Sequence, residues 1–261
     1  MKAAAFDYVK PASIDQVLSL LQERGDDARL LAGGQTLMAT LNMRLSEPQL
    51  VIDIGGIESL RGISVQGEVL RIGALATHTD IEFSPLVARH APLLKAAAPH
   101  IAHRAIRNRG TWGGSIAYAD PAAEWPACHL ALGGDVLVRG PRGERRIAID
   151  DFFTGLYSTA LAPDEMLVAS EIPLAGTDLW FGFQELARRH GDYAIVGMAA
   201  GARRVGDTLT QVRIALMGVD ATPLRARRCW CLWSAQARQR VPGIEQKRGK
   251  NNKRPRPWLR G

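Results

Sequence analysis

The stretch RNRGTWGGS, residues 107–115, joins two adjacent glycines to small hydroxyl residues. A stretch of the same kind, AGGQT, occupies residues 32–36. A backbone can approach a phosphate closely only where no Cβ intervenes, and free N–H and hydroxyl groups can then bond the phosphate oxygens. Arg107 and Arg109 are either surface charges or residues that orient the loop or meet a phosphate. One such stretch also fits an ordinary tight turn, but two together predict a diphosphate held from both sides, as in a dinucleotide cofactor.

Helix and strand signals surround the first glycine stretch. Ser13 and Gln16 have the spacing of a capping box, and the apolar residues that follow recur at helical spacing as far as Gly25. A short apolar strand is predicted at residues 29–31, leading into the glycines. Residues 36–45 are predicted to be helical, which places the partial positive charge of a helix N-terminus beside the loop.

The rest of the chain divides into a part with mixed helix and strand signals and a part with strand signals alone. The sequence predicts buried strands at 50–54 and 69–72, proline-punctuated helices over 85–105, and a hairpin across 135–149. Strand-length apolar runs separated by short turns then follow at 166–172, 179–186, 194–205 and 209–217. These runs predict an antiparallel sheet in a second domain, with a boundary near Pro163 or Pro173.

The composition is that of a soluble globular protein, with 46% hydrophobic and 23% charged residues. No window approaches the roughly 20 apolar residues that a membrane span needs, and the N-terminus has no apolar signal segment. We therefore expect a cytoplasmic protein without a membrane span. The three cysteines have no metal-ligand spacing, so neither an iron–sulfur site nor another metal site is predicted.

The formal net charge of +7 is concentrated at the C-terminus. Residues 226–261 carry most of the basic excess, with Glu245 as their only acid, and show no helical period. We expect this basic tail to be disordered. A nucleic-acid-binding protein acting through the tail is one alternative function. The chain before residue 226 has no stripe of basic residues, so we predict no nucleic-acid partner.

Two long blocks carry a resemblance to a known family. LLAGGQTLMATLNMRL (30–45) and IRNRGTWGGSIAYADPAAEWPA (106–127) together resemble the FAD-binding medium subunit of the xanthine dehydrogenase/carbon monoxide dehydrogenase family of molybdenum hydroxylases. A third block, FQELARRHGDYA (183–194), resembles the same family. The similarity runs to about residue 225, after which the tail departs from the family pattern and suggests a truncated or replaced C-terminus.

The resemblance implies an α+β fold. Residues 1–163 would form a vanillyl-alcohol oxidase-type FAD-binding domain of two subdomains. Residues 164–225 would form the sheet part of a small C-terminal α+β domain, and residues 226–261 the atypical tail.

The resemblance also implies individual cofactor-binding positions. They are Ala32, Gly33, Gly34, Gln35, Thr36, Thr111, Gly113, Gly114, Ser115, Asp120, Leu161, Gln184 and Tyr193. The two glycine stretches would hold the FAD diphosphate, and Asp120 would bond ribityl or ribose hydroxyls. Leu161 would lie near the adenine or flavin and Tyr193 near the isoalloxazine, whereas Gln184 stands where many relatives have a lysine. Trp112 replaces the usual Ile or Leu, a change that should be tolerated if its side chain packs outward.

The implied function is electron transfer through FAD. In such a subunit the flavin performs the chemistry, so no catalytic side chain is predicted. The implied partners are a large subunit with a molybdenum cofactor and a small 2Fe–2S subunit, with NAD, a quinone or another molecule as the final acceptor. A stand-alone flavin oxidase or dehydrogenase of the same fold is the other alternative. The substrate would belong to the molybdenum subunit and is left open.

Overall fold

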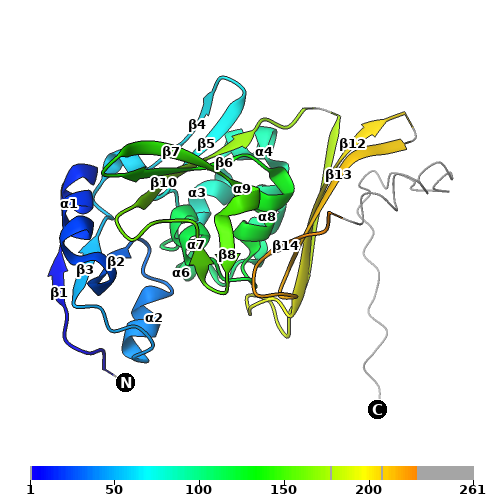
Figure 1. Ribbon diagram of the computed structural model, residues 1–261. Coiled ribbons are helices and arrows are strands. Elements are labelled where there is room, and N and C mark those ends of the chain that lie inside the picture. The colour runs from blue at the N-terminus through cyan, green and yellow to red at the C-terminus, as the bar shows by residue number, and fades with distance from the viewer. Residues whose placement is uncertain (1, 177, 207, 228–261) are drawn as a thin grey trace, which may run out of the picture.

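The computed structural model describes residues 2–176, 178–206 and 208–227 (Figure 1). The expectations for the basic tail from residue 228 onward, including disorder and nucleic-acid binding, lie outside the described residues. Among the described residues, no helix combines the length and the apolar character that crossing a membrane requires.

A small parallel sheet forms the N-terminal layer. Its strands lie in the order β1 (Asp7–Val9), β3 (Leu50–Asp53) and β2 (Ala28–Leu31). Helix α1 (Ile14–Arg24) packs on it and buries its apolar side against the sheet in one hydrophobic cluster. Helix α2 (Leu37–Asn42) begins directly after the first glycine stretch. The predicted strand at 29–31 and the helices on either side of it are therefore confirmed, although α2 is shorter than expected.

The start of α1 shows how local sequence forms this helix. The Ser13 hydroxyl accepts a hydrogen bond from the Gln16 N–H at 3.3 Å, as a helix cap does. The Gln16 side chain accepts from the Ala12 N–H at 2.9 Å, one residue before the position expected for a capping box. Gly25 ends the helix with a positive φ of 50°.

A five-stranded antiparallel sheet forms the middle of the molecule (Figure 1). Its order is β4 (Ile63–Gln66), β5 (Val69–Gly73), β10 (Met166–Pro173), β6 (Asp135–Gly140) and β7 (Gly143–Ala148). Strand β10 pairs with β5 on one side and β6 on the other. The run at 166–172, expected at the start of the second domain, therefore completes the sheet of the first.

The two faces of this sheet contribute to two hydrophobic cores. Val136 and Val138 of β6 face the larger core, whereas Leu137 between them faces the core shared with α1. This alternation follows from the two-residue period of a strand. The sheet thus holds the N-terminal layer on one side and a group of short helices on the other.

Short helices cover the face with the larger core. They are α3 (His78–Phe83), α4 (Pro85–His90), α5 (Pro92–Ala97), α6 (Arg104–Arg107), α7 (Trp112–Tyr118), α8 (Glu124–Leu132) and α9 (Ile149–Phe152), with the 3-10 turn η3 (Ala98–His100) after α5. Two further 3-10 turns lie outside this group: η1 (Gly25–Asp27) directly follows α1, and Leu60 of η2 (Glu58–Leu60) belongs to the core shared with α1. Pro85 and Pro92 occupy the first positions of their helices, where no N–H bond is lost. A two-stranded ribbon of β8 (Phe153–Gly155) and β9 (Ser158–Thr159) follows α9.

The C-terminal sheet packs its inner face against α5 and α8 (Figure 1). Its order is β11 (Leu179–Leu186), β12 (Val196–Val205), β13 (Thr208–Met217) and β14 (Leu224–Arg225), all antiparallel. Ala199, Ala215 and Met217 join the larger core from this sheet. The predicted antiparallel sheet is confirmed for the runs at 179–186, 194–205 and 209–217, whereas the run at 166–172 belongs to the other sheet.

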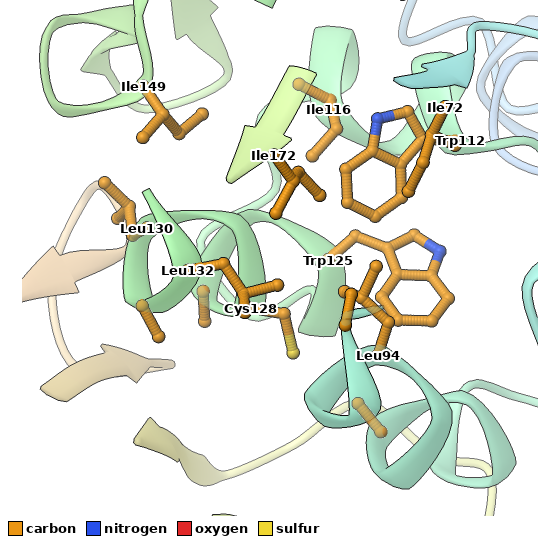
Figure 2. Packing of buried hydrophobic residues seen from close by; sticks show 14 of the residues in the cluster. Ile72, Leu94, Trp112, Ile116, Trp125, Cys128, Leu130, Leu132, Ile149 and Ile172 are labelled. Carbon is orange, nitrogen blue, oxygen red and sulfur yellow. The ribbon is translucent and has the colours of Figure 1, made fainter. Parts of the chain in front are cut away.

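The larger core is built around Trp112 and Trp125 (Figure 2). Trp112 is fully buried, so the outward packing given as the condition for tolerating it is not met. Its indole Nε1 donates to the Ser170 hydroxyl at 2.8 Å, which satisfies the one polar group of the side chain. An indole can therefore fill space in this core without leaving an unpaired donor.

Candidate cofactor-binding site

The two glycine stretches lie side by side. A Cβ placed on Gly33 would lie 2.2 Å from the carbonyl oxygen of Arg109 and 2.8 Å from the Cα of Gly110. Only glycine allows backbones to approach this closely. The contact is what a site shared by both stretches requires.

A third segment, residues 74–78, holds the second glycine stretch from the core side. Backbone hydrogen bonds join it to residues 110–113, and a β-bridge pairs Thr77 with Thr111. The bonds run from the Trp112 N–H to the Ala76 oxygen (2.8 Å), from the Gly113 N–H to the Ala74 oxygen (2.9 Å) and from the His78 N–H to the Gly110 oxygen (3.0 Å). Sequence patterns do not by themselves place Thr77 and His78 beside the second glycine stretch. A local signal was available, because Thr77 and Asp80 form a capping box at the start of α3.

The first glycine stretch presents a row of free backbone donors. In the part of the chain that the structure describes, the N–H groups of Gly33, Gly34, Gln35 and Thr36 donate to no protein oxygen. Thr36 stands at the start of α2, and its hydroxyl makes no capping bond. Successive free N–H groups before a helix form a concave site that suits an anion. We call residues 33–36 the anion nest.

The second glycine stretch is different, because the N–H groups of residues 112–115 are already bonded to the chain. Those of Trp112 and Gly113 bond the third segment, while Gly114 donates to the Thr111 hydroxyl at 3.2 Å and Ser115 to the Thr111 carbonyl at 3.1 Å. Thr111 is the N-cap of α7, which accounts for the last two bonds. The expectation of free N–H groups therefore holds for residues 33–36 but not for residues 112–115. The second can offer the hydroxyl protons of Thr111 and Ser115.

Arg107 takes a structural role among the alternatives left open for it. Its side chain is buried and donates to the carbonyl oxygens of Ile101 (2.9 Å) and Ala102 (3.1 Å) and to the Glu82 carboxylate (3.1 Å). These bonds hold the loop before α6. The guanidinium is thus committed to orienting the chain.

Asp120 lies among aromatic side chains just after α7. Its Oδ1 accepts a hydrogen bond from the Ala122 N–H at 2.9 Å, which forms a tight turn before α8. The ring centroids of Tyr118 and Tyr157 lie 5.1 Å apart. The negative charge of Asp120 raises the pKa of the Tyr157 phenol. Desolvation and then the Asp120 charge raise the pKa of Tyr193. Although Tyr193 is exposed as a whole residue, its phenol therefore lies within electrostatic reach of Asp120.

The C-terminal sheet reaches the same turn. The Gly218 N–H donates to the Pro121 oxygen at 2.9 Å, and a Cβ on Gly218 would lie 2.7 Å from the Ile195 oxygen. Residues 193–195 are thereby placed beside the segment that carries Asp120. Asp120 and Tyr193 are far apart in the sequence, so sequence patterns could not predict that their segments lie side by side.

Leu161 and Gln184 lie apart from the hydrogen bonds described above. Leu161 is half-buried against the larger core, with its N–H donating to the Thr159 hydroxyl at 3.3 Å. Gln184 is exposed on β11, on the opposite face from Glu185. Within the described ranges the Gln184 side chain makes no hydrogen bond. These two positions rest on the resemblance rather than on site geometry.

Comparison with known proteins decides the family. Residues 4–175 match the FAD binding domain in molybdopterin dehydrogenase, and residues 181–231 match the CO dehydrogenase flavoprotein C-terminal domain. The chain belongs to this family. It is an FAD-binding medium subunit of the molybdenum hydroxylases, FAD is its cofactor, and it is part of an oxidoreductase.

Relatives of this medium subunit act in several enzymes. The nicotine 6-hydroxylase medium subunit of Paenarthrobacter nicotinovorans is 44% identical over 218 residues, which is 84% of this chain and 76% of that protein. The carbon monoxide dehydrogenase medium chain of Hydrogenophaga pseudoflava is 39% identical over 220 residues, covering 84% and 77% of the two chains.

Solved structures of family members share the fold. Carbon monoxide dehydrogenase from Hydrogenophaga pseudoflava superimposes with a TM-score of 0.86 at 39% identity, covering 87% of this chain and 79% of the other. Quinoline 2-oxidoreductase from Pseudomonas putida 86 superimposes with a TM-score of 0.84 at 39% identity, covering 89% of this chain and 81% of the other. The expected fold class is therefore confirmed.

The medium subunit carries one buried acid beside the Asp120 turn. Glu124 is the first residue of α8, and its pKa is raised to about 7 by desolvation first and then by the charges of Glu185 and Asp120. A raised pKa means that the folded state holds the proton more tightly than the unfolded state. The protonated Glu124 therefore contributes its full share of folding stability below the pKa that glutamate has in the unfolded chain. That contribution is lost as the pH rises through the folded-state pKa of about 7.

We expect the Glu124→Gln variant to gain stability relative to the native chain as pH rises. Glutamine keeps the side-chain size and never ionises. The difference in free energy of unfolding should grow by about 2 kcal/mol between about pH 5 and pH 8. Urea unfolding across that range measures it, with Glu144→Gln on exposed β7 as the control that should change less. A difference that stays constant with pH would contradict the assignment.

Proposed function

We propose that this chain accepts electrons from the iron–sulfur clusters of a small partner subunit and passes them through FAD to a final acceptor. NAD, a quinone or another molecule would be that acceptor. A large subunit with a molybdenum cofactor would supply the electrons by oxidising the substrate. The medium-subunit relatives support this arrangement, since they belong to multi-subunit enzymes. FAD suits the role because a flavin can exchange electrons both singly and in pairs.

The proposal rests on the anion nest. Its four consecutive free N–H groups lie against the second glycine stretch, where an anionic diphosphate would be stabilised by backbone donors. The Thr36, Thr111 and Ser115 hydroxyls would add side-chain donors. Ala32, Gly113 and Gly114 would contribute mainly by lacking bulk. These donors together suit the diphosphate that links the two halves of FAD.

The remaining proposed positions would hold the rest of FAD. Asp120 keeps one carboxylate oxygen outside its turn bond, and that oxygen would accept from ribityl or ribose hydroxyls. Tyr193 would flank the isoalloxazine, and Leu161 would face the adenine or flavin. Gln184 would contact the cofactor without the charge that a lysine supplies. No residue of this chain is assigned to bond breaking.

The substrate of the complex belongs to the partner subunits. Relatives of similar identity are named for nicotine, carbon monoxide and caffeine. Similarity of the medium subunit therefore does not select among these compounds. We also place the domain boundary between residues 175 and 181, because β10 completes the first sheet and the two family matches meet there.

We expect Asp120→Asn to weaken FAD binding about tenfold. The amide oxygen of asparagine can keep the turn bond to the Ala122 N–H, so the change removes the charge and one acceptor but leaves the turn. Titration of the apo full chain with FAD, followed by flavin fluorescence, measures the Kd. Asp15→Asn on the exposed side of α1 is the control.

Binding data can contradict the proposal in two ways. A native chain that takes up no FAD removes the proposed function. Equal Kd values for Asp120→Asn and the native chain remove only the role of Asp120. The electron path is tested in the assembled complex, where substrate should bleach the flavin absorbance before acceptor is added. The purified chain alone should show no bleaching by substrate.

A further inference from the structure

His78 lies directly beneath the second glycine stretch. A Cβ placed on Gly110 would lie 2.6 Å from Nε2 of the His78 ring and 2.8 Å from its Cδ2. The His78 backbone N–H also donates to the Gly110 oxygen at 3.0 Å. Ring and backbone of one residue therefore both support Gly110.

Gly110 in turn supports the anion nest. Its Cα would lie 2.8 Å from a Cβ on Gly33, the first residue of the nest. His78, Gly110 and Gly33 thus form a continuous stack of contacts from the core to the nest. Because both glycines lack a side chain, the stack has no flexible part that could absorb a shift of the imidazole.

The core holds the His78 ring in a single orientation. The indole Nε1 of Trp125 donates to His78 Nδ1 at 2.9 Å, and the two rings meet edge to face. Trp125 itself is buried beside Trp112 in the larger core (Figure 2). Since Nδ1 accepts this bond, the neutral ring carries its proton on Nε2, toward Gly110. Burial and then the Arg107 charge lower the pKa of His78 to about 4, which keeps the ring neutral near neutral pH.

We propose that His78 is a positioning residue for FAD binding. His78 fixes the position of Gly110 against Gly33 and thereby the shape of the anion nest. The proposal rests on the proposed function, because it concerns how the cofactor site is held. His78 itself touches no cofactor. It acts through the backbone of the second glycine stretch.

Two full-length variants at His78 test the role of the ring, with the Kd for FAD as the readout. His78→Leu keeps an apolar side chain of similar size but leaves the Trp125 N–H without an acceptor, and should raise the Kd about tenfold. His78→Asn places its amide oxygen near the position of Nδ1 and should stay within about threefold of the native chain. Rescue by asparagine separates the hydrogen bond from simple packing.

His129→Leu is the matched control. His129 is also fully buried on the same side of the sheet, with its ring 5.5 Å from that of Trp112, and neither ring nitrogen has a hydrogen-bond partner among the described residues. The change removes a buried imidazole without breaking a bond to the glycine stretches. Its Kd for FAD should match that of the native chain.

The outcomes distinguish the inference from the proposed function. Absence of FAD binding by the native chain would remove the proposed function itself. Native-like binding by His78→Leu, an equal loss in His129→Leu, or no rescue by His78→Asn would overturn the role of His78 alone. If His78→Leu does not fold, Trp125→Phe takes its place, because it frees the ring from its donor. A Kd raised about threefold by that variant would support the inference, and an unchanged Kd would overturn it.

Discussion

Gly33→Ala should raise the Kd for FAD by about a hundredfold, the largest effect on binding expected from any single methyl group in this chain. The added Cβ would lie 2.2 Å from the Arg109 oxygen, far inside van der Waals contact, with backbone rather than a flexible side chain as the neighbour. The two glycine stretches must then move apart. That movement tilts the free N–H groups of the anion nest away from a common point. Calorimetric or fluorescence titration of the apo chain measures the change.

Gly182→Ala is the control for Gly33→Ala. It adds the same methyl group on β11, where a Cβ would have no atom within 4 Å. We expect its Kd to equal that of the native chain. Native affinity in Gly33→Ala would mean that the close approach of the two stretches does not shape the cofactor site.

Trp112→Ala should lower the free energy of unfolding by about 3–5 kcal/mol, the largest stability effect expected here. The side chain is fully buried at the centre of the larger core (Figure 2). Truncation leaves a cavity that neighbouring residues can fill only in part. It also leaves the Ser170 hydroxyl without its donor. Urea unfolding followed by circular dichroism measures the loss.

Trp180→Ala makes the same truncation at an exposed position. Trp180 lies on the outer face of β11 and is 49% exposed. The expected loss is below about 1 kcal/mol. Similar losses at the two tryptophans would show that Trp112 does not carry the core as its burial indicates.

Local sequence patterns predicted the elements that surround the site. The helix after Ser13 and the strand before the first glycine stretch depend on neighbours within a few residues, so their spacing alone indicates them. The hairpin of β6 and β7 is equally local, because its turn residues follow one another in the chain. Long blocks of specific sequence were enough to indicate the family.

The direction of side chains was beyond such patterns. Trp112 turns inward because Ser170, far along the chain, accepts its indole N–H. Arg107 is withdrawn from any phosphate because three carbonyls of an adjacent loop and Glu82 use its donors. His78 lies under Gly110 because its backbone N–H bonds the Gly110 oxygen and Trp125 holds its ring. Each outcome depends on a partner that spacing along the chain does not reveal.

By itself, the sequence determined the kind of ligand and the places of the two glycine stretches, because a missing Cβ and a nearby helix start are local properties. The tertiary structure alone decided which stretch keeps free donors. The N–H groups of residues 33–36 donate to no protein oxygen in the described part of the chain, whereas those of residues 112–115 bond the third segment and the cap of α7. A backbone donor is available to a cofactor only where the fold brings no other acceptor to it.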